Sequence, residues 1–213
     1  MKNKDYEDAM FEIDLSDVEA LMENTLPSPE LLDFYRRLSN REVVWNTLIG
    51  DGIIDISLYI LKWNKEDYDI PAEQRKPIKI FINSDGGDPT VIMNLADMIA
   101  LSKTPVITIG MGRVYSAAGM LLMAGHKRLI FPSTTVLIHD GSGGVRGDTA
   151  KILDNLEFQR QYEERYCAFV VEHTKISEKV MKQNYRRDWF MFSEEAVSYG
   201  VADKIITDIE EIM

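Results

Sequence analysis

The sequence predicts an α/β fold built from parallel βαβ units. Short apolar runs rich in β-branched residues alternate along the chain with longer segments that have helical periodicity or a helix-start signal. This alternation is typical of strands joined by crossover helices. The 213 residues, 45% hydrophobic and 28% charged, suit one globular domain. A chain of this length can bury about 70% of the surface that it exposes when unfolded.

The first 40 residues are predicted to be an acidic extension that contains one helix. Residues 1–27 hold eight acidic side chains against two lysines, with scattered apolar residues between them. We expect a flexible arm or a partner-binding segment here. Ser28 is a good helix cap, Pro29 suits the first helical position and Glu30 suits the first turn. This helix is expected to end near Leu38.

The rest of the chain, residues 41–213, is predicted to form one main domain of alternating elements. Its strands are expected at 42–45, 78–82, 105–109, 129–131, 135–138 and 204–206. Its helices are expected after a cap at Asp51, at 90–102, from about Tyr115, at 149–171, at 177–184, and after a cap at Ser193. In the helix after Asp51, the apolar residues follow the 3.6-residue period.

Composition excludes several classes of protein. The formal net charge of −11 and the pI of about 4.8 argue against nucleic acid as a partner, because a phosphate backbone would be repelled. No apolar run approaches 18 residues and no signal-peptide core follows the N-terminus, so we expect no membrane association and a cytoplasmic location. The single cysteine, Cys167, rules out an intrachain disulfide and is interpreted as a core residue of a helix.

Ser116 stands alone at a predicted turn between a strand and a helix. The segment around it is rich in glycine and alanine, which would let a substrate backbone approach. Free N–H groups in the first turn of a helix point at developing negative charge. Two interpretations stay open from this stretch alone: a nucleophile, or a serine that only packs a helix start against the sheet. The better-known G-x-S-x-G motif is absent.

Gly86 and Gly87 directly follow the predicted strand 78–82. Paired glycines let the main chain turn sharply and expose N–H groups. The pair is therefore either an oxyanion hole, a clamp for an extended peptide, or a plain turn. A phosphate loop is excluded, because no G-K-[ST] follows.

His139 is the best placed of the three histidines to act as a general base. It ends a predicted strand, whereas His126 and His173 are expected in solvated positions. A catalytic histidine needs a carboxylate that orients its ring. Asp140 is adjacent, but consecutive strand residues point to opposite faces, so Asp188 is the better candidate. Its alternative role is an ion pair with a neighbouring arginine. No two histidines lie at metal-ligand spacing and there is no cysteine cluster, so we expect no metal site.

Six sequence blocks, in order, resemble the proteolytic subunit of the Clp protease, a self-compartmentalising serine peptidase. The resemblance covers roughly residues 41–207, and the blocks together identify the chain as similar to this family. They lie at 83–87 (similar to N-S-P-G-G), 112–119 (G-x-A-A-S-M-G/A), 136–139 (V-M-I-H), 143–147 (G-G-x-x-G), 187–190 (R-D-x-F) and 195–203 (E-A-x-x-Y-G-L-x-D). The resemblance implies a ClpP/crotonase-like α/β fold of repeated ββα units with a protruding handle helix at 149–171.

The resemblance also implies roles for individual residues. Ser116 would be the nucleophile, His139 the general base and Asp188 the orienting acid of a serine endopeptidase. Oxyanion and substrate-binding positions would be Gly86, Gly87, Ala117, Gly143, Gly144 and Val145. The segment 141–147 would be an edge strand that pairs with an extended polypeptide substrate. The family further implies a homo-oligomer of stacked rings, a tetradecamer, joined by the handle helices. It implies no cofactor, with ATP used only by an AAA+ unfoldase as partner.

Several positions depart from the family pattern. Asp85 replaces a proline beside the glycine pair, Tyr115 replaces a small residue before Ser116, and Arg113 adds a cation. Asp140 and Gly141 replace a polar residue and a proline. These departures predict altered specificity or a conditional peptidase, with a carboxylate near His139 raising the pH needed for base catalysis. The first 40 residues do not resemble the family's axial loop, so docking of an unfoldase is left open.

Two other functions stay open at this point. A crotonase-like acyl-CoA hydratase or isomerase would use the backbone N–H groups to hold a thioester enolate, but it would need catalytic carboxylates in place of His139 and Asp188. A non-catalytic ring subunit would only support assembly, and the intact set of Ser116, His139 and Asp188 argues against it.

Overall fold

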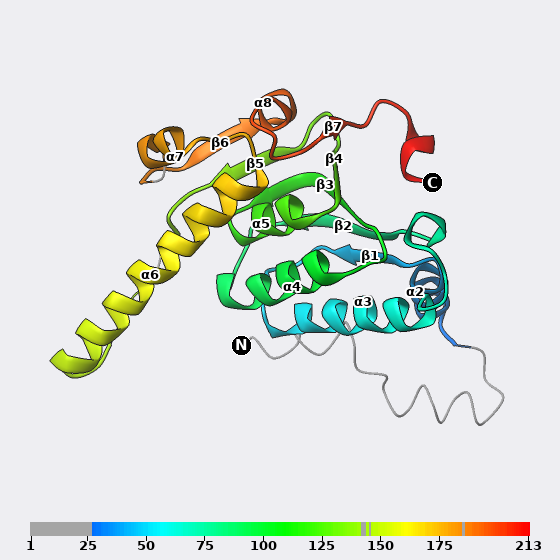
Figure 1. Cartoon of the computed structure of the whole chain (residues 1–213), viewed down its shortest axis with the longest axis horizontal. Helices are drawn as coiled ribbons and strands as arrows, with labels where there is room; N and C mark the ends of the chain where they lie inside the picture. The colour runs from blue at the N-terminus through cyan, green and yellow to red at the C-terminus, as the bar shows by residue number, and fades with distance from the viewer. Residues whose placement is uncertain (1–26, 142–143, 145, 185) are drawn as a thin grey trace.

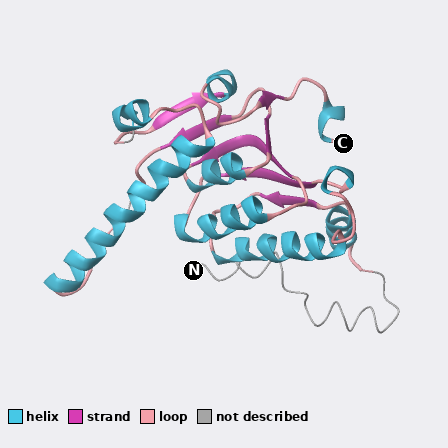
Figure 2. Ribbon diagram, in the orientation of Figure 1, coloured by secondary structure: helices cyan, strands magenta, loops and turns pink. Residues whose placement is uncertain are grey.

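A largely parallel sheet forms the centre of the molecule (Figures 1 and 2). This structure, a computed structural model, describes residues 27–141, 144, 146–184 and 186–213. Its strands are β1 (Glu42–Trp45), β2 (Ile78–Ser84), β3 (Val106–Tyr115), β4 (Lys127–Ile130), β5 (Thr135–Ile138), β6 (Trp189–Phe192) and β7 (Lys204–Ile205). The main path runs β1-β2-β3-β4-β7. The α/β fold predicted from the sequence is therefore confirmed.

The central strand β3 serves two branches of the sheet. Its first half pairs with β4, from Ile107 opposite Lys127, and its second half pairs with β5, from Arg113 opposite Thr135. A register shift lies between the two halves, where β3 passes β2. The strand thus runs to Tyr115, well beyond the predicted 105–109. The helix expected from Tyr115 begins instead at Ala117.

Strand β6 pairs antiparallel with β5, with Ile138 opposite Trp189. The sequence prediction placed only a loop here. The segment Trp189–Phe192 is entirely apolar, so it lacks the alternation that marks a half-buried strand. In the structure only Met191 of this strand is buried.

Helices cover the sheet and bury its apolar side chains. They are α2 (Pro29–Ser39), α3 (Ile54–Glu66), α4 (Pro89–Leu101), α5 (Ala117–Ala124), α6 (Thr149–His173), α7 (Glu178–Asn184) and α8 (Ser193–Ser198), with short 3-10 helices at Asp51–Ile53, Ala72–Gln74 and Ile209–Ile212. Figure 1 shows α3 and α4 side by side along the sheet, with α5 next to α4. Every residue of α5 is buried, because this short helix lies between the sheet and its neighbours.

Two predicted helix caps are wrong. Asp51 lies inside a 3-10 helix that precedes α3 and makes no capping bond. Ser193 is the first residue of α8, and its hydroxyl donates instead to the carbonyls of Phe131 and Thr134. The serine thus ties α8 to the turn before β5. At Ser28 the predicted cap is confirmed, since Ser28 Oγ accepts from the N–H of Leu31 at 3.2 Å.

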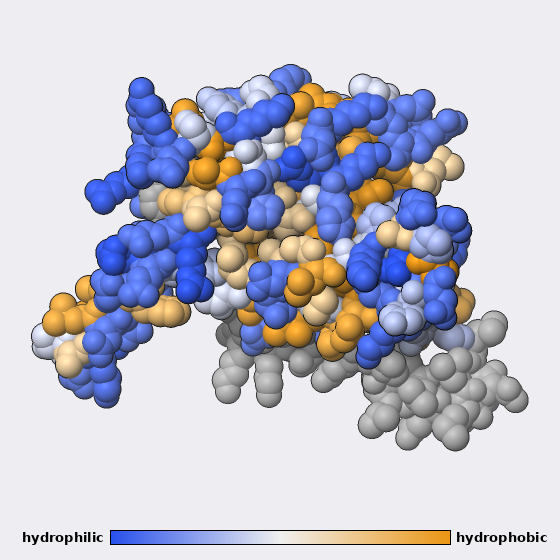
Figure 3. Space-filling view, in the orientation of Figure 1, coloured by the Kyte–Doolittle hydropathy of each residue, from blue (hydrophilic) through white to orange (hydrophobic). Residues whose placement is uncertain are grey.

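The helix α6 projects from the body (Figures 1 and 3). Its buried residues, Tyr166, Phe169 and Val170, lie toward its C-terminal end. Its outer half exposes Leu153, Leu156 and Phe158, where Figure 3 shows apolar side chains gathered at the tip. Between the two parts, the Tyr162 hydroxyl donates to the carbonyl of Pro89 at the start of α4. Burial, with the nearby Asp88 carboxylate, raises the pKa of Tyr162 to about 12.

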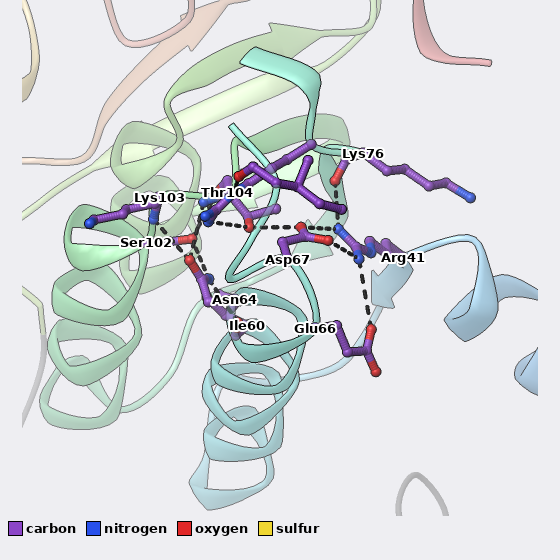
Figure 4. Close-up of polar contacts among 11 residues, drawn as sticks. Arg41, Ile60, Asn64, Glu66, Asp67, Lys76, Ser102, Lys103 and Thr104 are labelled. Carbon is purple, nitrogen blue, oxygen red and sulfur yellow. Dashed lines mark hydrogen bonds and ion pairs between the residues drawn. The ribbon is translucent and has the colours of Figure 1, made fainter. Parts of the chain in front are cut away.

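A buried polar network ties β1 to the end of α3 (Figure 4). Arg41 Nη1 and Nη2 donate to the two carboxylate oxygens of Asp67 at 2.6 and 2.8 Å. Thr104 Oγ1 donates to Asp67 at 3.0 Å, and Arg41 also donates to the carbonyl of Lys76 at 2.9 Å. The backbone of Arg41 has a positive φ of 63°. The network joins segments that lie far apart in the sequence.

Candidate active site

Sheet register brings Ser116, His139 and Asp188 to one end of three adjacent strands. Strands β3 and β5 are parallel, so Ser116 and His139 each follow the carboxyl end of a strand. Strand β6 is antiparallel to β5, so Asp188 precedes it at the same end. The last pair, Ile138 opposite Trp189, puts His139 and Asp188 next to each other across the two strands.

Ser116 occupies a strained turn between β3 and α5. Its φ of 56° and ψ of −122° lie where residues with a side chain rarely occur. Its N–H donates to the carbonyl of Leu137 at 2.9 Å, and its carbonyl accepts from the N–H of Gly119 at 2.9 Å. These two bonds fix the conformation of the turn. The hydroxyl of Ser116 makes no hydrogen bond with any residue that the structure describes. A sharp turn that presents a serine at a helix start is the geometry of a nucleophile elbow.

His139 and Asp188 form a loose pair. His139 Nδ1 lies 3.3 Å from Asp188 Oδ1, within ion-pair range. The His139 side chain is 20% exposed, but that of Asp188 is 64% exposed. In the described part of the chain, no hydrogen bond joins the His139 ring to Ser116 Oγ. The single chain thus brings the side chains of Ser116, His139 and Asp188 to the same end of the sheet. In the described residues, however, no hydrogen bond connects the serine to the histidine–aspartate pair.

The Gly86-Gly87 turn packs directly against Ser116. A Cβ built on Gly86 would lie 2.7 Å from Ser116 Cβ and 2.6 Å from the Tyr115 carbonyl oxygen, so only glycine fits this contact. Gly86 O accepts from the N–H of Ile49 at 2.8 Å, and the N–H of Asp88 donates to Ile49 O at 2.9 Å. In this parallel bridge the N–H of Gly87 points away from Ile49.

Two backbone N–H groups near Ser116 stay available. Those of Gly87 and Ala117 donate to no acceptor in the described part of the chain. Ala117 is the first residue of α5, where N–H groups have no partner within the helix. The predicted oxyanion positions Gly86, Gly87 and Ala117 are thus all close to Ser116, with Gly86 serving as the contact residue.

The predicted substrate-binding segment 141–147 is only partly described. Gly143 and Val145 lie outside the described residues. Gly144 is exposed, and neither it nor the other described residues of the segment belong to a strand. The predicted edge strand for a polypeptide therefore stays a prediction.

The contacts that Tyr115 and Asn83 make near the site were not predicted from the sequence. Tyr115 stacks edge-on against Phe190 with ring centroids 5.7 Å apart, and its hydroxyl lies 2.8 Å from Thr135 Oγ1. Asn83 Oδ1 accepts from the N–H of Arg113 at 3.1 Å, and its amide donates to Asn46 at 2.6 Å. The motif blocks contained Tyr115, Asn83 and Phe190, but not the strand pairing that joins them.

Other reactive groups do not form a second centre. Burial raises the pKa of the Cys167 thiol above its ordinary value, which disfavours the thiolate. Within residues 27–141, 144, 146–184 and 186–213, no group of three or more metal-binding side chains is placed to hold an ion. None of the helices described there is long and apolar enough to cross a bilayer.

A serine in a strained turn, with a histidine–aspartate pair and unused N–H groups nearby, is an arrangement typical of serine hydrolases. The comparison with known families is more specific. The model of the Clp protease family matches residues 37–209. Because this match covers most of the chain, the protein belongs to the Clp protease family. Membership supports a peptidase of the Clp type and the ClpP/crotonase-like fold expected from the sequence.

Proposed function

We propose that this chain is a serine endopeptidase that hydrolyses unfolded or short polypeptides inside a ring-shaped homo-oligomer. Ser116 is the nucleophile, His139 the general base and Asp188 the acid that orients the imidazole. One observation carries the proposal: β3, β5 and β6 deliver these residues to the same end of the sheet, beside the Gly86-Gly87 turn.

The reaction follows from these positions. His139 Nε2 takes the proton of Ser116 as the oxygen attacks the scissile carbonyl, while Asp188 stabilises the imidazolium through Nδ1. The N–H groups of Gly87 and Ala117 donate to the oxyanion of the tetrahedral intermediate. His139 then protonates the leaving amine. Water, activated by the same histidine, hydrolyses the acyl-enzyme.

Exposed features of the single chain support an oligomer. The outer half of α6 presents apolar side chains to solvent, and surfaces of this kind are typical of interfaces. Phe190 and Phe192 of β6 are also exposed beside Asp188. We propose that stacked rings, as in a tetradecamer, bury these groups. The enzyme then needs no cofactor of its own, and an AAA+ unfoldase as partner supplies ATP-driven unfolding in the cytoplasm.

The test uses the variant Ser116→Ala. We expect wild-type protein to cleave short fluorogenic peptides and to form a covalent adduct with a peptidyl phosphonate at Ser116. The variant should lose both, with turnover reduced by about 10⁶-fold in kcat, as when a triad serine is removed. Native mass spectrometry should give the same ring for both proteins, which serves as the control for folding.

Other results would point to the other functions. Undiminished cleavage by Ser116→Ala would overturn the assignment of the nucleophile. A wild-type ring that neither cleaves nor labels would be a non-catalytic subunit. Tight binding of an acyl-CoA analogue, without phosphonate labelling, would favour the crotonase-like reaction.

A further inference from the structure

An ion pair links the two segments that meet at the site. Arg113 Nη1 lies 3.0 Å from Asp85 Oδ1, and both side chains are about half exposed. Asp85 directly precedes Gly86, and Arg113 lies three residues before Ser116. The pair therefore bridges the glycine turn and the strand that carries the serine. From the sequence, the two residues were only separate departures from the family pattern.

A bulge in β3 places Arg113 in this position. Ile82 of β2 lies opposite Gly110, but Ser84 lies opposite Val114, so β3 contains extra residues between these pairs. Gly112, within the bulge, has a positive φ of 67°. A bulge bends a strand and re-aims its side chains, and bulges often occur next to active sites.

The main chain of Arg113 is held as well as its side chain. Its N–H donates to Asn83 Oδ1 at 3.1 Å. A Cβ on Gly112 would lie only 2.7 Å from that same oxygen, and the positive φ of this residue also favours glycine. Asn83 thus binds the main chain of Arg113, and Asp85 binds its guanidinium group.

The glycine turn has little stiffness of its own. Gly86 and Gly87 both have positive φ, 96° and 151°, and neither has a side chain that could pack. Ile49 holds the turn from one side by two backbone hydrogen bonds. The Asp85–Arg113 pair ties it to β3, the strand that leads to Ser116.

We propose that Asp85 and Arg113 form a positioning pair for the oxyanion hole, an inference that rests on the proposed function. The pair holds the N–H of Gly87 where the oxyanion develops. Arg113 also neutralises the Asp85 carboxylate, whose charge would otherwise oppose negative charge forming close by. A half-exposed ion pair contributes little to stability. Catalysis, however, is sensitive to a misplacement of about 1 Å.

This role predicts a specific pattern among variants. Arg113→Ala leaves Asp85 unpaired beside the site and should lower kcat about tenfold, a fraction of the loss expected when an oxyanion donor is removed. Asp85→Ala loosens the turn but removes the anion, so its effect should be smaller. The exchanged variant Asp85→Arg/Arg113→Asp restores the pair and should recover most of the lost activity.

The experiment measures kcat and KM on a short peptide, together with the affinity of a peptide boronate. The boronate forms a tetrahedral adduct with the serine and thus reports on the oxyanion hole. We expect Arg113→Ala to weaken boronate binding by about the same factor as kcat, with KM changed less than about twofold. Lys62→Ala is the matched control, since Lys62 is equally exposed and pairs with Glu66 on α3, and it should change neither quantity.

The outcomes separate this inference from the function on which it rests. Wild-type kcat and boronate affinity in Arg113→Ala would overturn the positioning role alone. An exchanged variant as slow as Arg113→Ala would also overturn it, because charge pairing would then not matter. If the wild-type ring itself neither cleaves nor labels at Ser116, both proposals fail.

Discussion

Two polar clusters of this protein differ in how far their polar groups are used in hydrogen bonds. The closed cluster is formed by Arg41 and Asp67 with their partners, and the open cluster by Ser116, His139 and Asp188. Each contains one of the two non-glycine residues that have positive φ in the described part of the chain, Arg41 and Ser116. At Arg41 the side chain is fixed by hydrogen bonds to Asp67 and to the carbonyl of Lys76. At Ser116 the backbone is held by hydrogen bonds, but the hydroxyl makes no hydrogen bond with any described residue.

The carboxylates differ in the same way. Asp67 accepts two hydrogen bonds from Arg41 and one from Thr104, and its side chain is 4% exposed (Figure 4). Asp188 makes one looser contact with His139 and is mostly exposed. A network that satisfies all its members fixes structure, whereas one with unused capacity can bind a reacting group. The first cluster should therefore govern stability, and the second activity.

Of the two carboxylates, Asp188 gives the larger expected effect, and that effect is on catalysis. Asp188→Asn should lower kcat by about 10⁴-fold, because the amide favours the wrong tautomer of the histidine. The free energy of unfolding should change by less than about 0.5 kcal/mol, since the side chain is exposed. Peptide cleavage and urea unfolding measure the two quantities.

Asp140→Asn is the control for this experiment, because Asp140 is adjacent to His139 but exposed. At the pH of maximal activity it should leave kcat within about threefold, since no tautomer depends on it. An equal loss in both variants would mean that Asp188 has no special role in orienting His139.

The next effect is on stability and concerns the other cluster. Asp67→Ala should destabilise the protein by about 3 kcal/mol, because the buried Arg41 charge keeps only the Lys76 carbonyl and a longer contact with the half-exposed Glu66. Turnover should change little at temperatures where the variant is folded. Urea unfolding at one fixed protein concentration measures the difference, since ring assembly also contributes to stability.

Asp33→Ala gives the matched control for the buried pair. On the surface of α2, Asp33 pairs with Arg36 at 2.7 Å and with Arg37 at 3.1 Å, whereas the buried Arg41–Asp67 contact is 2.6 Å. The loss of the Asp33 carboxylate should cost less than about 1 kcal/mol. A similar cost for Asp33→Ala and Asp67→Ala would show that burial does not distinguish the two pairs.

The sequence predicted the open cluster better than the closed one. Ser116, His139 and Asp188 belong to short motif blocks, and the resemblance of these blocks to a known family selected the three residues together. Arg41 and Asp67 belong to no motif and come together only where the chain after α3 meets the residue before β1. Tertiary contacts of this kind leave no local periodicity that a sequence pattern could reveal.

The same limit applied within the site. The β-branched runs predicted most strands, since they fit a buried parallel sheet. Strand β6 was not predicted, because a short apolar run has no period. The register between β5 and β6, which places Asp188 next to His139, was therefore not predicted either. The Asp85–Arg113 pair also depends on a bulge in β3 that no residue pattern marked.

The smallest expected effect is on how the stability of the protein depends on pH, and it concerns Asp67. Hydrogen bonding by Arg41, with a further bond from Thr104, lowers the pKa of Asp67 despite its burial. A carboxyl whose folded pKa is lowered stabilises the protein above its unfolded pKa, about 3.9, and this contribution disappears as pH falls toward the folded value. Wild-type protein and Asp33→Ala should therefore lose stability below about pH 4.5 more steeply than Asp67→Ala, in urea unfolding at a series of pH values. Parallel acid curves for wild-type and Asp67→Ala would mean that the Asp67 carboxyl titrates alike in the folded and unfolded chain, and that the closed cluster does not act through its charge.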